Sequence, residues 1–418
     1  MILKRHRLGV LALVALVASS CAAAVPSHSA APPKGHGRSA IPPHGTPSSH
    51  PSSTAPTTPP PPTTSTTVPP APPGTLVEDL TWVSDIHGWA LVDVENCGQP
   101  NCTEVLTTID GGVVWSKIGS IAASSSSCTG CAVLGVTHIR FANDLDGYAF
   151  DPDLFITTDG GQTWTRQIGP FVAALEPAGP DVMRVAFTET GCPGPCDLTV
   201  QSAPVASATW HSLTAPLPAD GVQLVRQGVD DAYVALYKNP AGGVEDAHAT
   251  LMVSHDDGAT WNVRPDPCWD VGGEEYDTTA IAAAPQSVLA VLCRDRMQGQ
   301  NAFVAVSTDG GAEFATRPLV PGSAMLGTLA ATSATTLFVG TSAFVGTGST
   351  EWVLLASSDG GQSWRQVAEE TGEVASDFPA ASFLGFESAR AGRWVGYPYD
   401  IWETTDGGNT WTRQPVAP

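Results

Sequence analysis

The sequence predicts an all-β protein whose folded domain is a seven-bladed β-propeller of four-stranded antiparallel blades. Three observations predict this fold. A short motif, Ser/Thr-x-Asp-x-Gly-x-x-Trp/Phe, occurs six times within residues 76–418. Each copy lies in a repeat with enough β-rich segments and polar turns for four short strands. The chain is only 14% charged and contains 42 glycines, a composition that argues against a helical bundle.

The spacing of the motif sets the number of blades. Successive motif aspartates are 49, 97, 53, 50 and 47 residues apart. The step of 97 residues is two repeats, because residues 203–210 keep Thr209 and Trp210 but have lost the Asp and the Gly. Seven repeats of about 49 residues then fill residues 76–418, and repeats of this length close rings of blades. The six motif aspartates are Asp110, Asp159, Asp256, Asp309, Asp359 and Asp406.

The motif has a structural explanation. An Asp carboxylate can accept backbone N–H bonds within its own turn. The second Gly tolerates a positive φ angle, and the Trp offers a large apolar ring for packing between sheets. We therefore expect the six aspartates to stabilise hairpins rather than to take part in catalysis.

Residues 1–24 have the features of an export signal. Lys4, Arg5 and Arg7 precede an apolar run of 11 residues, which is too short to span a bilayer. The run leads to Ala18-Ser-Ser-Cys21, which resembles the lipobox of bacterial lipoproteins, with Ala18 where Leu or Val is usual. The resemblance implies that Cys21 is lipidated after cleavage. Residues 22–24 are a rival site for ordinary signal peptidase, so plain secretion is the alternative.

Residues 25–75 are expected to form a disordered linker. This segment holds 16 prolines between Pro26 and Pro73, mixed with Ser, Thr, Ala and Gly. Such a composition cannot bury a core and gives an extended, semi-rigid spacer. Below a lipid anchor it would act as a stalk for the propeller.

The charge distribution excludes one class of partner. The chain has 19 basic and 41 acidic residues, a net charge of −22, and no acidic residue precedes residue 75. The propeller itself therefore carries 14 basic and 41 acidic side chains. A surface this acidic repels phosphate backbones, so we expect no nucleic-acid binding. We expect a monomer that meets the membrane through its lipid anchor alone.

Eight cysteines remain besides Cys21, and an even number in an exported protein indicates disulfides. Local pairing is the simplest arrangement, although 128–131 also matches a redox Cys-x-x-Cys motif. In a propeller, the turns between first and second and between third and fourth strands lie on one face. All eight cysteines fall in the loops of the other face, here called the loop face. The expected pairs are Cys97–Cys102, Cys128–Cys131, Cys192–Cys196 and Cys268–Cys293.

The loop face also holds the densest acidic and aromatic patch, within residues 268–277. One hypothesis is a sugar-stacking platform beside a pair of carboxylates, as glycosidases need. A second is a Ca²⁺ site made of hard oxygen ligands, and a third is a solvated acidic rim. The candidate catalytic acids are Asp270, Glu274, Glu275 and Asp277, and the candidate binding aromatics are Trp269, Tyr276, Tyr397 and Tyr399.

The six motifs resemble the Asp-box, or bacterial neuraminidase repeat, and so residues 76–418 resemble the Asp-box propellers. That family includes sialidases, xyloglucanases, sortilin-type receptors and the photosystem II assembly factor. The seven repeats look most like the assembly factor, which implies a non-enzymatic scaffold, although the basic patch of that family is not apparent here. The Phe/Tyr-Arg-Ile-Pro motif of the sialidases is absent as well.

These features together predict a binding or assembly scaffold at the bacterial cell envelope, with a protein or a glycan as its partner. No cofactor and no resident metal are expected. The alternative is a glycoside hydrolase of the sialidase or xyloglucanase type that uses a carboxylate pair on the loop face.

Overall fold

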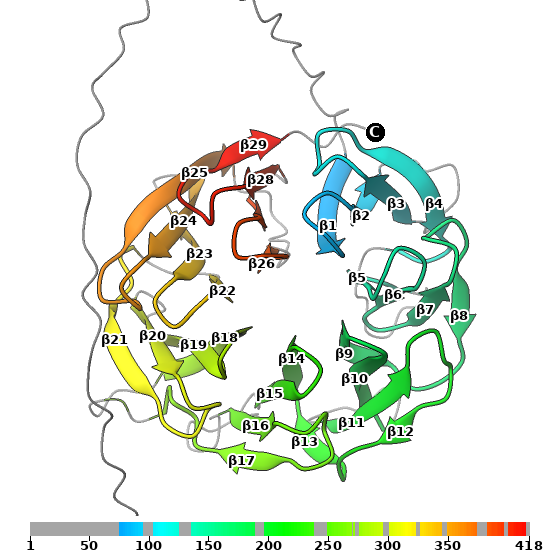
Figure 1. Ribbon diagram of the computed structural model, residues 1–418, viewed down its shortest axis with the longest axis horizontal. Helices are drawn as coiled ribbons and strands as arrows, with labels where there is room; N and C mark the ends of the chain where they lie inside the picture. Colours follow the sequence, from blue (N-terminus) through cyan, green and yellow to red (C-terminus); the bar gives the residue numbers. More distant parts are fainter. Residues whose placement is uncertain are drawn as a thin grey trace, which may run out of the picture. The chain divides into compact units, whose positions relative to one another are not determined.

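The computed structural model confirms the predicted architecture. It describes residues 75–94, 103–124, 135–188, 196–237, 249–269, 271, 276–295, 301–322, 327–344, 349–373, 383–396 and 400–414. These residues form strands and turns and contain no helix, so the described segments include none that could cross a membrane. The strands make seven antiparallel sheets arranged in a ring (Figure 1).

Each blade is a meander whose first strand is innermost and whose last is outermost (Figure 1). Blade 1 contains β1 (Thr75–Trp82), β2 (Gly88–Val94), β3 (Thr103–Thr108) and β4 (Ser116–Ile121). Blade 2 contains β5 (His138–Phe141), β6 (Gly147–Phe150), β7 (Leu154–Thr157) and β8 (Thr165–Gln167). Blade 3 contains β9 (Val172–Ala178), β10 (Asp181–Phe187), β11 (Cys196–Pro204), β12 (His211–Ser212) and β13 (Leu217–Ala219).

The other four blades follow the same order. Blade 4 contains β14 (Gly221–Gln227), β15 (Asp231–Tyr237), β16 (Thr250–Ser254) and β17 (Asn262–Arg264). Blade 5 contains β18 (Tyr276–Ala284), β19 (Val288–Asp295), β20 (Ala302–Ser307) and β21 (Ala315–Leu319). Blade 6 contains β22 (Gly327–Ala331), β23 (Leu337–Phe344), β24 (Ser349–Ser357) and β25 (Arg365–Glu373). Blade 7 contains β26 (Leu384–Phe386), β27 (Gly392–Val395), β28 (Ile401–Thr404) and β29 (Thr412–Gln414).

Blade 3 is the irregular blade, and it is the one whose motif has been lost. Its outer strand is split, because β12 and β13 both pair with β11. The retained Trp210 packs under the Arg184 guanidinium, whose central carbon lies 4.0 Å from the ring centroid. The predicted repeat is therefore a blade, but without an Asp-box turn its outer edge is built from two short pieces.

Two hydrogen bonds recur in the Asp-box turn of every intact copy. In blade 2, the Thr157 hydroxyl donates to Asp159 Oδ1 (2.8 Å) and accepts from the Gly161 N–H (3.0 Å). Thr163 donates its N–H to Oδ1 and its hydroxyl to Oδ2 of Asp159, and these bonds lower the pKa of Asp159 to about 2. Equivalent bonds from the Ser or Thr to the Asp and from the Gly to the Ser or Thr recur in the other five boxes.

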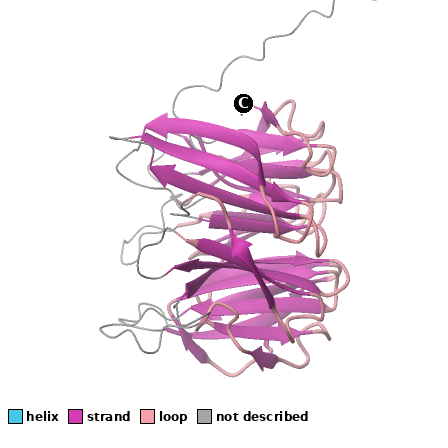
Figure 2. Ribbon diagram, turned by 90° about the vertical axis from the view of Figure 1, so that its left-hand side faces the viewer, coloured by secondary structure: helices cyan, strands magenta, loops and turns pink. Residues whose placement is uncertain are grey.

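The Asp-box turns share one face of the ring with the turns between the first and second strands. In blade 1 the Gly111 N–H donates to the Ile86 carbonyl, and in blade 2 the Gly160 N–H donates to the Leu145 carbonyl. Seen from the side, the described turns gather on this face (Figure 2). We call it the Asp-box face.

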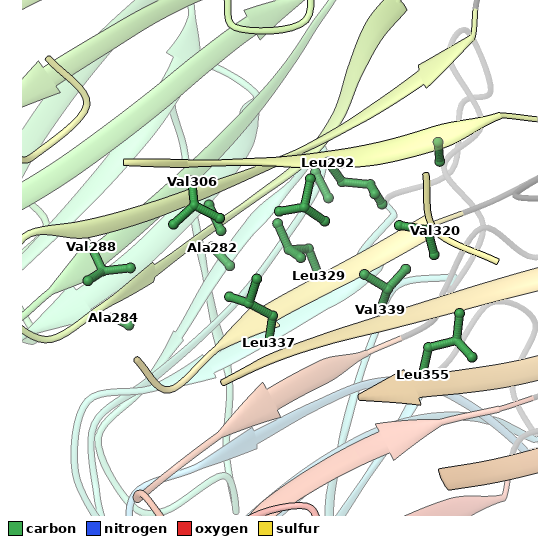
Figure 3. Close-up of a cluster of buried hydrophobic side chains, with 14 residues drawn as sticks. Ala282, Ala284, Val288, Leu292, Val306, Val320, Leu329, Leu337, Val339 and Leu355 are labelled. Atoms are coloured by element: carbon green, nitrogen blue, oxygen red, sulfur yellow. The ribbon is translucent and has the colours of Figure 1, made fainter. Parts of the chain in front are cut away.

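The core lies between neighbouring blades. Alternate residues of β19 point to opposite sides of blade 5: Leu292 packs with Leu329 and Leu337 of blade 6 (Figure 3), whereas Val291 packs with Val253 of blade 4. Because both faces of the strand are buried, its sequence is a continuous apolar run rather than an alternating one. Packing of this kind repeats around the ring and fixes the blades against each other.

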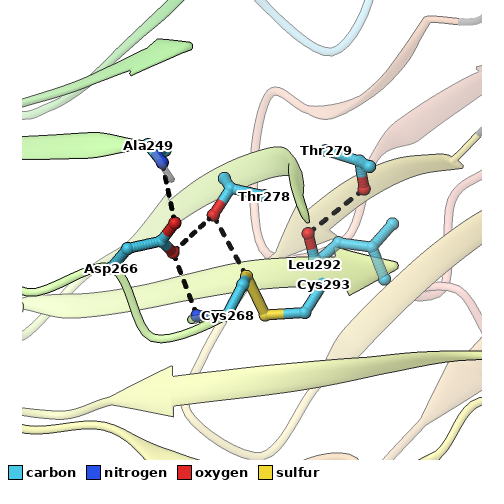
Figure 4. The surroundings of a disulfide bond; sticks show 7 residues. All are labelled: Ala249, Asp266, Cys268, Thr278, Thr279, Leu292 and Cys293. Atoms are coloured by element: carbon cyan, nitrogen blue, oxygen red, sulfur yellow. Dashed lines mark hydrogen bonds between the residues drawn. A yellow bond between two sulfur atoms is a disulfide. The ribbon is translucent and has the colours of Figure 1, made fainter. Parts of the chain in front are cut away.

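One predicted disulfide joins blades 4 and 5. Cys268, which follows β17, is bonded to Cys293 of β19, and both are fully buried (Figure 4). Asp266 anchors the same segment, since its carboxylate accepts from the N–H groups of Ala249 and Cys268 and from the Thr278 hydroxyl. For a sequence separation of 25 residues, the chain-entropy contribution of this bridge is about 3.5 kcal/mol. Cys196 is also disulfide-bonded. Its predicted partner and the other predicted cysteine pairs lie outside the described residues, as does Cys21.

The ring closes without exchanging a strand. Blade 1 is made entirely from the N-terminal end of the propeller and blade 7 entirely from the C-terminal end. Side chains bridge the seam instead: Val395 and Ile401 of blade 7 pack in one buried cluster with Leu80 and Trp115 of blade 1.

Arg393 of β27 is the polar centre of this seam. Its side chain is fully buried and lies over the Trp82 ring, with 3.8 Å from its central carbon to the ring centroid. Nη1 donates to Glu387 (2.6 Å), and Nη2 donates to Glu403 (3.1 Å) and to the Asp85 carbonyl of blade 1 (2.9 Å). Burial raises the pKa of Glu387 to about 7, and Arg393 opposes that rise.

Replacing Arg393 with Met should destabilise the ring. The change removes the contacts to blade 1 and leaves two acidic side chains without their cation, so we expect a loss of about 3 kcal/mol or more in unfolding free energy. Urea unfolding followed by tryptophan fluorescence measures it. Arg390→Met is the matched control, because Arg390 is exposed in the same blade; it should change stability by less than about 0.5 kcal/mol. Equal stability of the two variants would contradict this account of the seam.

Candidate functional site

A cavity of about 610 Å³ occupies the centre of the ring. Its walls are the inner strands of all seven blades, from β1 and β5 round to β26. A pocket of this size suits a small ligand or a short stretch of an extended chain. We call it the central channel.

The channel presents strand edges that have no neighbouring strand, and side chains cover part of them. Asp79 of β1 accepts the Ile139 N–H of β5 (3.0 Å), and the Thr81 hydroxyl accepts the Phe141 N–H (3.1 Å). Between blades 4 and 5, Gln223 accepts from the Ile281 N–H (2.9 Å) and donates to the Thr279 carbonyl (3.0 Å). These bonds satisfy backbone groups on the inner edges and couple neighbouring blades.

Charged side chains from blades 1, 2 and 3 form one wall of the channel. Arg140 of β5 donates to Asp79 of β1 (2.6 Å) and to Glu176 of β9 (2.8 Å). Burial opposes the ionisation of Asp79, but Arg140 and His138 outweigh it and lower the pKa of Asp79. We call Asp79, His138, Arg140 and Glu176 the charged wall.

His138 extends this network toward the loop face. Its Nδ1 lies 3.2 Å from Asp79 Oδ2 and its Nε2 lies 3.9 Å from Asp151 Oδ2. Burial alone would lower the pKa of His138, whereas the hydrogen bond and charge of Asp79 raise it, and the net shift is upward. Asp151 also accepts a hydrogen bond from the Thr137 hydroxyl (3.1 Å).

Glu78 lies beside the charged wall and behaves differently from its neighbour Asp79. It is the extra residue of a β-bulge, since Val77 pairs with Val92 and Asp79 pairs with Leu91. Burial is the largest cause that raises the pKa of Glu78 to about 7, and the nearby charge of Asp93 adds to it. Near neutral pH, Glu78 is therefore only partly ionised, whereas the adjacent Asp79 is ionised.

The opposite side of the channel is lined by small and apolar residues. Blade 5 contributes residues 280–283, which are Ala, Ile, Ala and Ala, and blade 6 contributes residues 327–331, which are Gly, Thr, Leu, Ala and Ala. The channel therefore has one charged wall and one apolar wall, and a bound molecule could present different chemistry to each.

The charged wall does not include the acids chosen from the sequence. Asp270, Glu274, Glu275, Tyr397 and Tyr399 lie outside the described residues. Trp269 lies in a turn after β17, and Tyr276 and Asp277 begin β18.

The Tyr276 ring packs edge-on against Phe303, with 4.9 Å between the ring centroids. Among the described residues, no group of three or more His, Cys, Asp or Glu side chains is arranged to hold a metal ion.

A sequence signal for the charged wall existed in Arg140. It is one of two basic residues between 76 and 165, the other being Lys117. A basic residue within a β-rich run of an acidic chain needs an acidic partner when it is buried. The partners lie 61 residues upstream and 36 residues downstream, so only the fold identifies them.

Comparison with known proteins supports the fold. The family model described as the BNR/Asp-box repeat matches residues 155–166, which contain the box of blade 2. The chain is thus a seven-bladed β-propeller whose second blade contains a BNR/Asp-box repeat. A search of curated proteins finds no match.

Several solved structures are similar to this chain in fold. YCF48 from Cyanidioschyzon merolae shares 14% identity at a TM-score of 0.51, over 82% of this chain and 98% of that one. An ancestral GH74 enzyme shares 13% identity at a TM-score of 0.50, over 83% of this chain and 47% of that one. An ulvan lyase of polysaccharide lyase family PL25 shares 10% identity at a TM-score of 0.52, over 82% of this chain and 94% of that one. Identities this low establish the shared fold alone.

Glu78→Gln should remove part of the pH dependence of stability. A carboxyl whose pKa is about 7 when folded and about 4.5 when unfolded stabilises the fold fully below pH 4.5. That contribution disappears as the pH rises through 7. After allowance for partial exposure, we expect the unfolding free energy of Glu78→Gln, relative to that of wild type, to increase by about 2 kcal/mol between pH 5 and pH 8.

Urea unfolding at several pH values between 5 and 8 tests this expectation. The control is Glu313→Gln, which alters an exposed glutamate of the blade 5 Asp-box. It should change the unfolding free energy by the same amount at pH 5 and at pH 8. If Glu78→Gln also leaves the difference constant, Glu78 is ionised like an ordinary surface glutamate and this description of the bulge is wrong.

Proposed function

We propose that this protein is an exported, lipid-anchored propeller that binds a protein or glycan partner at the cell envelope without transforming it, and that the central channel receives the partner. The observation that carries the proposal is the channel itself. A cavity of about 610 Å³ sets a hydrogen-bonding charged wall opposite an apolar one. Binding sites commonly combine an apolar lining with a few placed polar groups.

The charged wall is organised in advance for recognition. Asp79 is held by Arg140, by His138 and by the backbone N–H groups of Leu80 and Ile139. Groups held in this way need no reordering when a ligand arrives, which lowers the entropic cost of binding. Glu176 uses Oε1 for Arg140, and its Oε2 has no hydrogen bond among the described residues.

A second candidate function is glycoside hydrolysis, and Glu78 is the observation that favours it. Glycosidases pair a protonated carboxylic acid with an ionised carboxylate. Environments that push two carboxyl pKa values apart mark such pairs, and Glu78 is raised to about 7 while Asp79 is lowered. The acids of the loop face, Asp270, Glu274, Glu275 and Asp277, are the other candidates for this chemistry.

One experiment on the full chain distinguishes binding from hydrolysis. The immobilised protein is offered a panel of cell-envelope polysaccharides, and retention and the release of reducing ends are both measured. If no polysaccharide is retained, partners are cross-linked in intact cells instead. The proposal expects retention or cross-linking without release, whereas release of reducing ends would establish the hydrolase.

Variants of channel-lining residues test whether the partner binds in the channel. Glu176→Gln removes the charge of a carboxylate on the charged wall, and Ala331→Trp adds a large side chain to the apolar wall and so narrows the channel. A charge-assisted hydrogen bond is worth about 1.5–3 kcal/mol, so Glu176→Gln should weaken binding by about tenfold or more. Glu104→Gln is the matched control, because Glu104 pairs with Lys117 on the outer strands of blade 1. If both channel variants bind as the control does, the partner does not use the channel.

Lipid anchoring at Cys21 has a direct test. Cys21→Ala should move the protein from the membrane fraction to the soluble extracytoplasmic fraction, because the acyl chains are the predicted attachment. Fractionation of cells labelled with a palmitate analogue measures both location and label. An unlabelled wild-type protein that is soluble outside the cell would instead indicate plain secretion.

A further inference from the structure

Blade 1 exposes Ile and Val side chains at three Asp-box positions where the other intact boxes have polar residues or alanine. Its Asp-box carries Ile109, Val113 and Val114, which are 71%, 54% and 58% exposed. At the first of these positions, the other five boxes have Thr158, His255, Thr308, Ser358 and Thr405. At the third they have Thr163, Thr260, Glu313, Ser363 and Thr410. The repeats act as internal controls, and blade 1 departs from them.

Val114 is the sharpest departure. In four other boxes the residue at this position donates a hydroxyl hydrogen bond to Oδ2 of the box aspartate: Thr163, Thr260, Ser363 and Thr410. Val114 makes the backbone bond to Asp110 but has no hydroxyl to make the second one. Blade 1 therefore lacks a local stabilising bond and exposes an isopropyl group to solvent instead.

The neighbouring turns extend the apolar surface. The residue whose carbonyl accepts from the Asp-box backbone is Ile86 in blade 1 and Leu145 in blade 2, and they are 57% and 56% exposed. In blades 4 to 7 the corresponding residues are Asp230, Ser287, Thr335 and Arg390. Apolar side chains at this position thus occur in the two adjacent blades only, among the blades that make this bond.

Hydrogen bonds hold the turns that carry these residues next to one another. The Gly111 N–H bond to the Ile86 carbonyl (3.0 Å) holds the box of blade 1 against its neighbouring turn. His87 Nδ1 lies 2.8 Å from Asp144 Oδ1, which holds the turn of blade 1 beside the turn of blade 2. We call Ile86, Ile109, Val113, Val114 and Leu145 the blade 1 patch. Exposed apolar side chains gathered on neighbouring turns in this way mark interaction sites on soluble proteins.

We propose that the blade 1 patch docks a protein partner through a segment that is both apolar and basic. The acidic charges around the patch are the reason to expect a basic segment. Asp85, Asp144 and Asp146 lie on the same two turns, and Asp144 is 73% exposed. The propeller carries 41 acidic and 14 basic side chains, so a second copy would be repelled, as would an anionic lipid surface. The patch lies on the Asp-box face and adds a surface outside the proposed channel site.

The repeats supply a variant that should keep the fold. Ile109→Thr, Val113→Gln and Val114→Thr together give blade 1 the box sequence of residues 157–164 in blade 2. Since that sequence already forms an Asp-box turn, and since Thr at 114 restores the missing hydroxyl bond, the triple variant should unfold at the same urea concentration as wild type or a higher one.

The probe is a synthetic amphipathic Leu/Lys peptide, compared with a Leu/Glu peptide of the same apolar pattern. Fluorescence anisotropy measures its binding to the full chain. The proposal expects the triple variant to bind the Leu/Lys peptide about tenfold or more weakly than wild type. A second variant, Ile86→Thr with Leu145→Thr, should weaken binding in the same direction, and the Leu/Glu peptide should bind poorly throughout.

The matched control is Val263→Thr, which removes an apolar side chain that is 69% exposed on the outer strand of blade 4. It should bind the Leu/Lys peptide as wild type does. Equal binding by wild type and the triple variant would overturn the proposal. Patch-dependent self-association in sedimentation, or patch-dependent binding to anionic vesicles, would overturn it too, because the occupant would then be a second copy or a membrane.

Discussion

A closed ring is stable only if its first and last blades hold together, and here no strand is shared between them. The chain meets this constraint with side chains, centred on Arg393. A buried guanidinium is favourable only when its donors and its charge are matched. Two glutamates, two backbone carbonyls and the Trp82 ring match its charge and its Nη donors across the seam. The channel depends on this closure, because its opposite walls come from blades that only the ring holds in place.

Inside the ring, the inner strands face a second constraint: each has one edge without a strand partner. The chain meets it with side chains that cross from one blade to the next, such as Asp79 to the Ile139 N–H. The same carboxylate then anchors Arg140 and His138. The groups that seal the inner edge and the groups that form the charged wall are thus partly the same residues, which explains why the candidate site lies between blades 1 and 3.

The sequence determined the fold well because the fold repeats. A turn motif at even spacing predicts the number of blades, and the loss of Asp and Gly near Trp210 correctly marked a blade rather than a gap. The sequence also predicted the Cys268–Cys293 bridge, because the two cysteines are close to each other along the chain. Ring closure was not predictable, since Arg393 and Trp82 are 311 residues apart and no pattern links them.

The candidate site was harder to predict, for a physical reason. The candidate acids of residues 270–277 are close together in the sequence, whereas Asp79, Arg140 and Glu176 come together only when three inner strands line a channel. Local density of charge is visible in a sequence, but burial and pairing are not. The pKa of Glu78 depends on a bulge in β1, and bulges leave little trace in a sequence.

Hydrogen exchange on the full chain, free and with its partner bound, tests the central claim most directly. The account predicts slower exchange in peptides that cover the channel-lining strands β1, β5, β9 and β22, with outer strands such as β17 and β21 unchanged. Protection confined to outer strands would contradict a binding site in the channel.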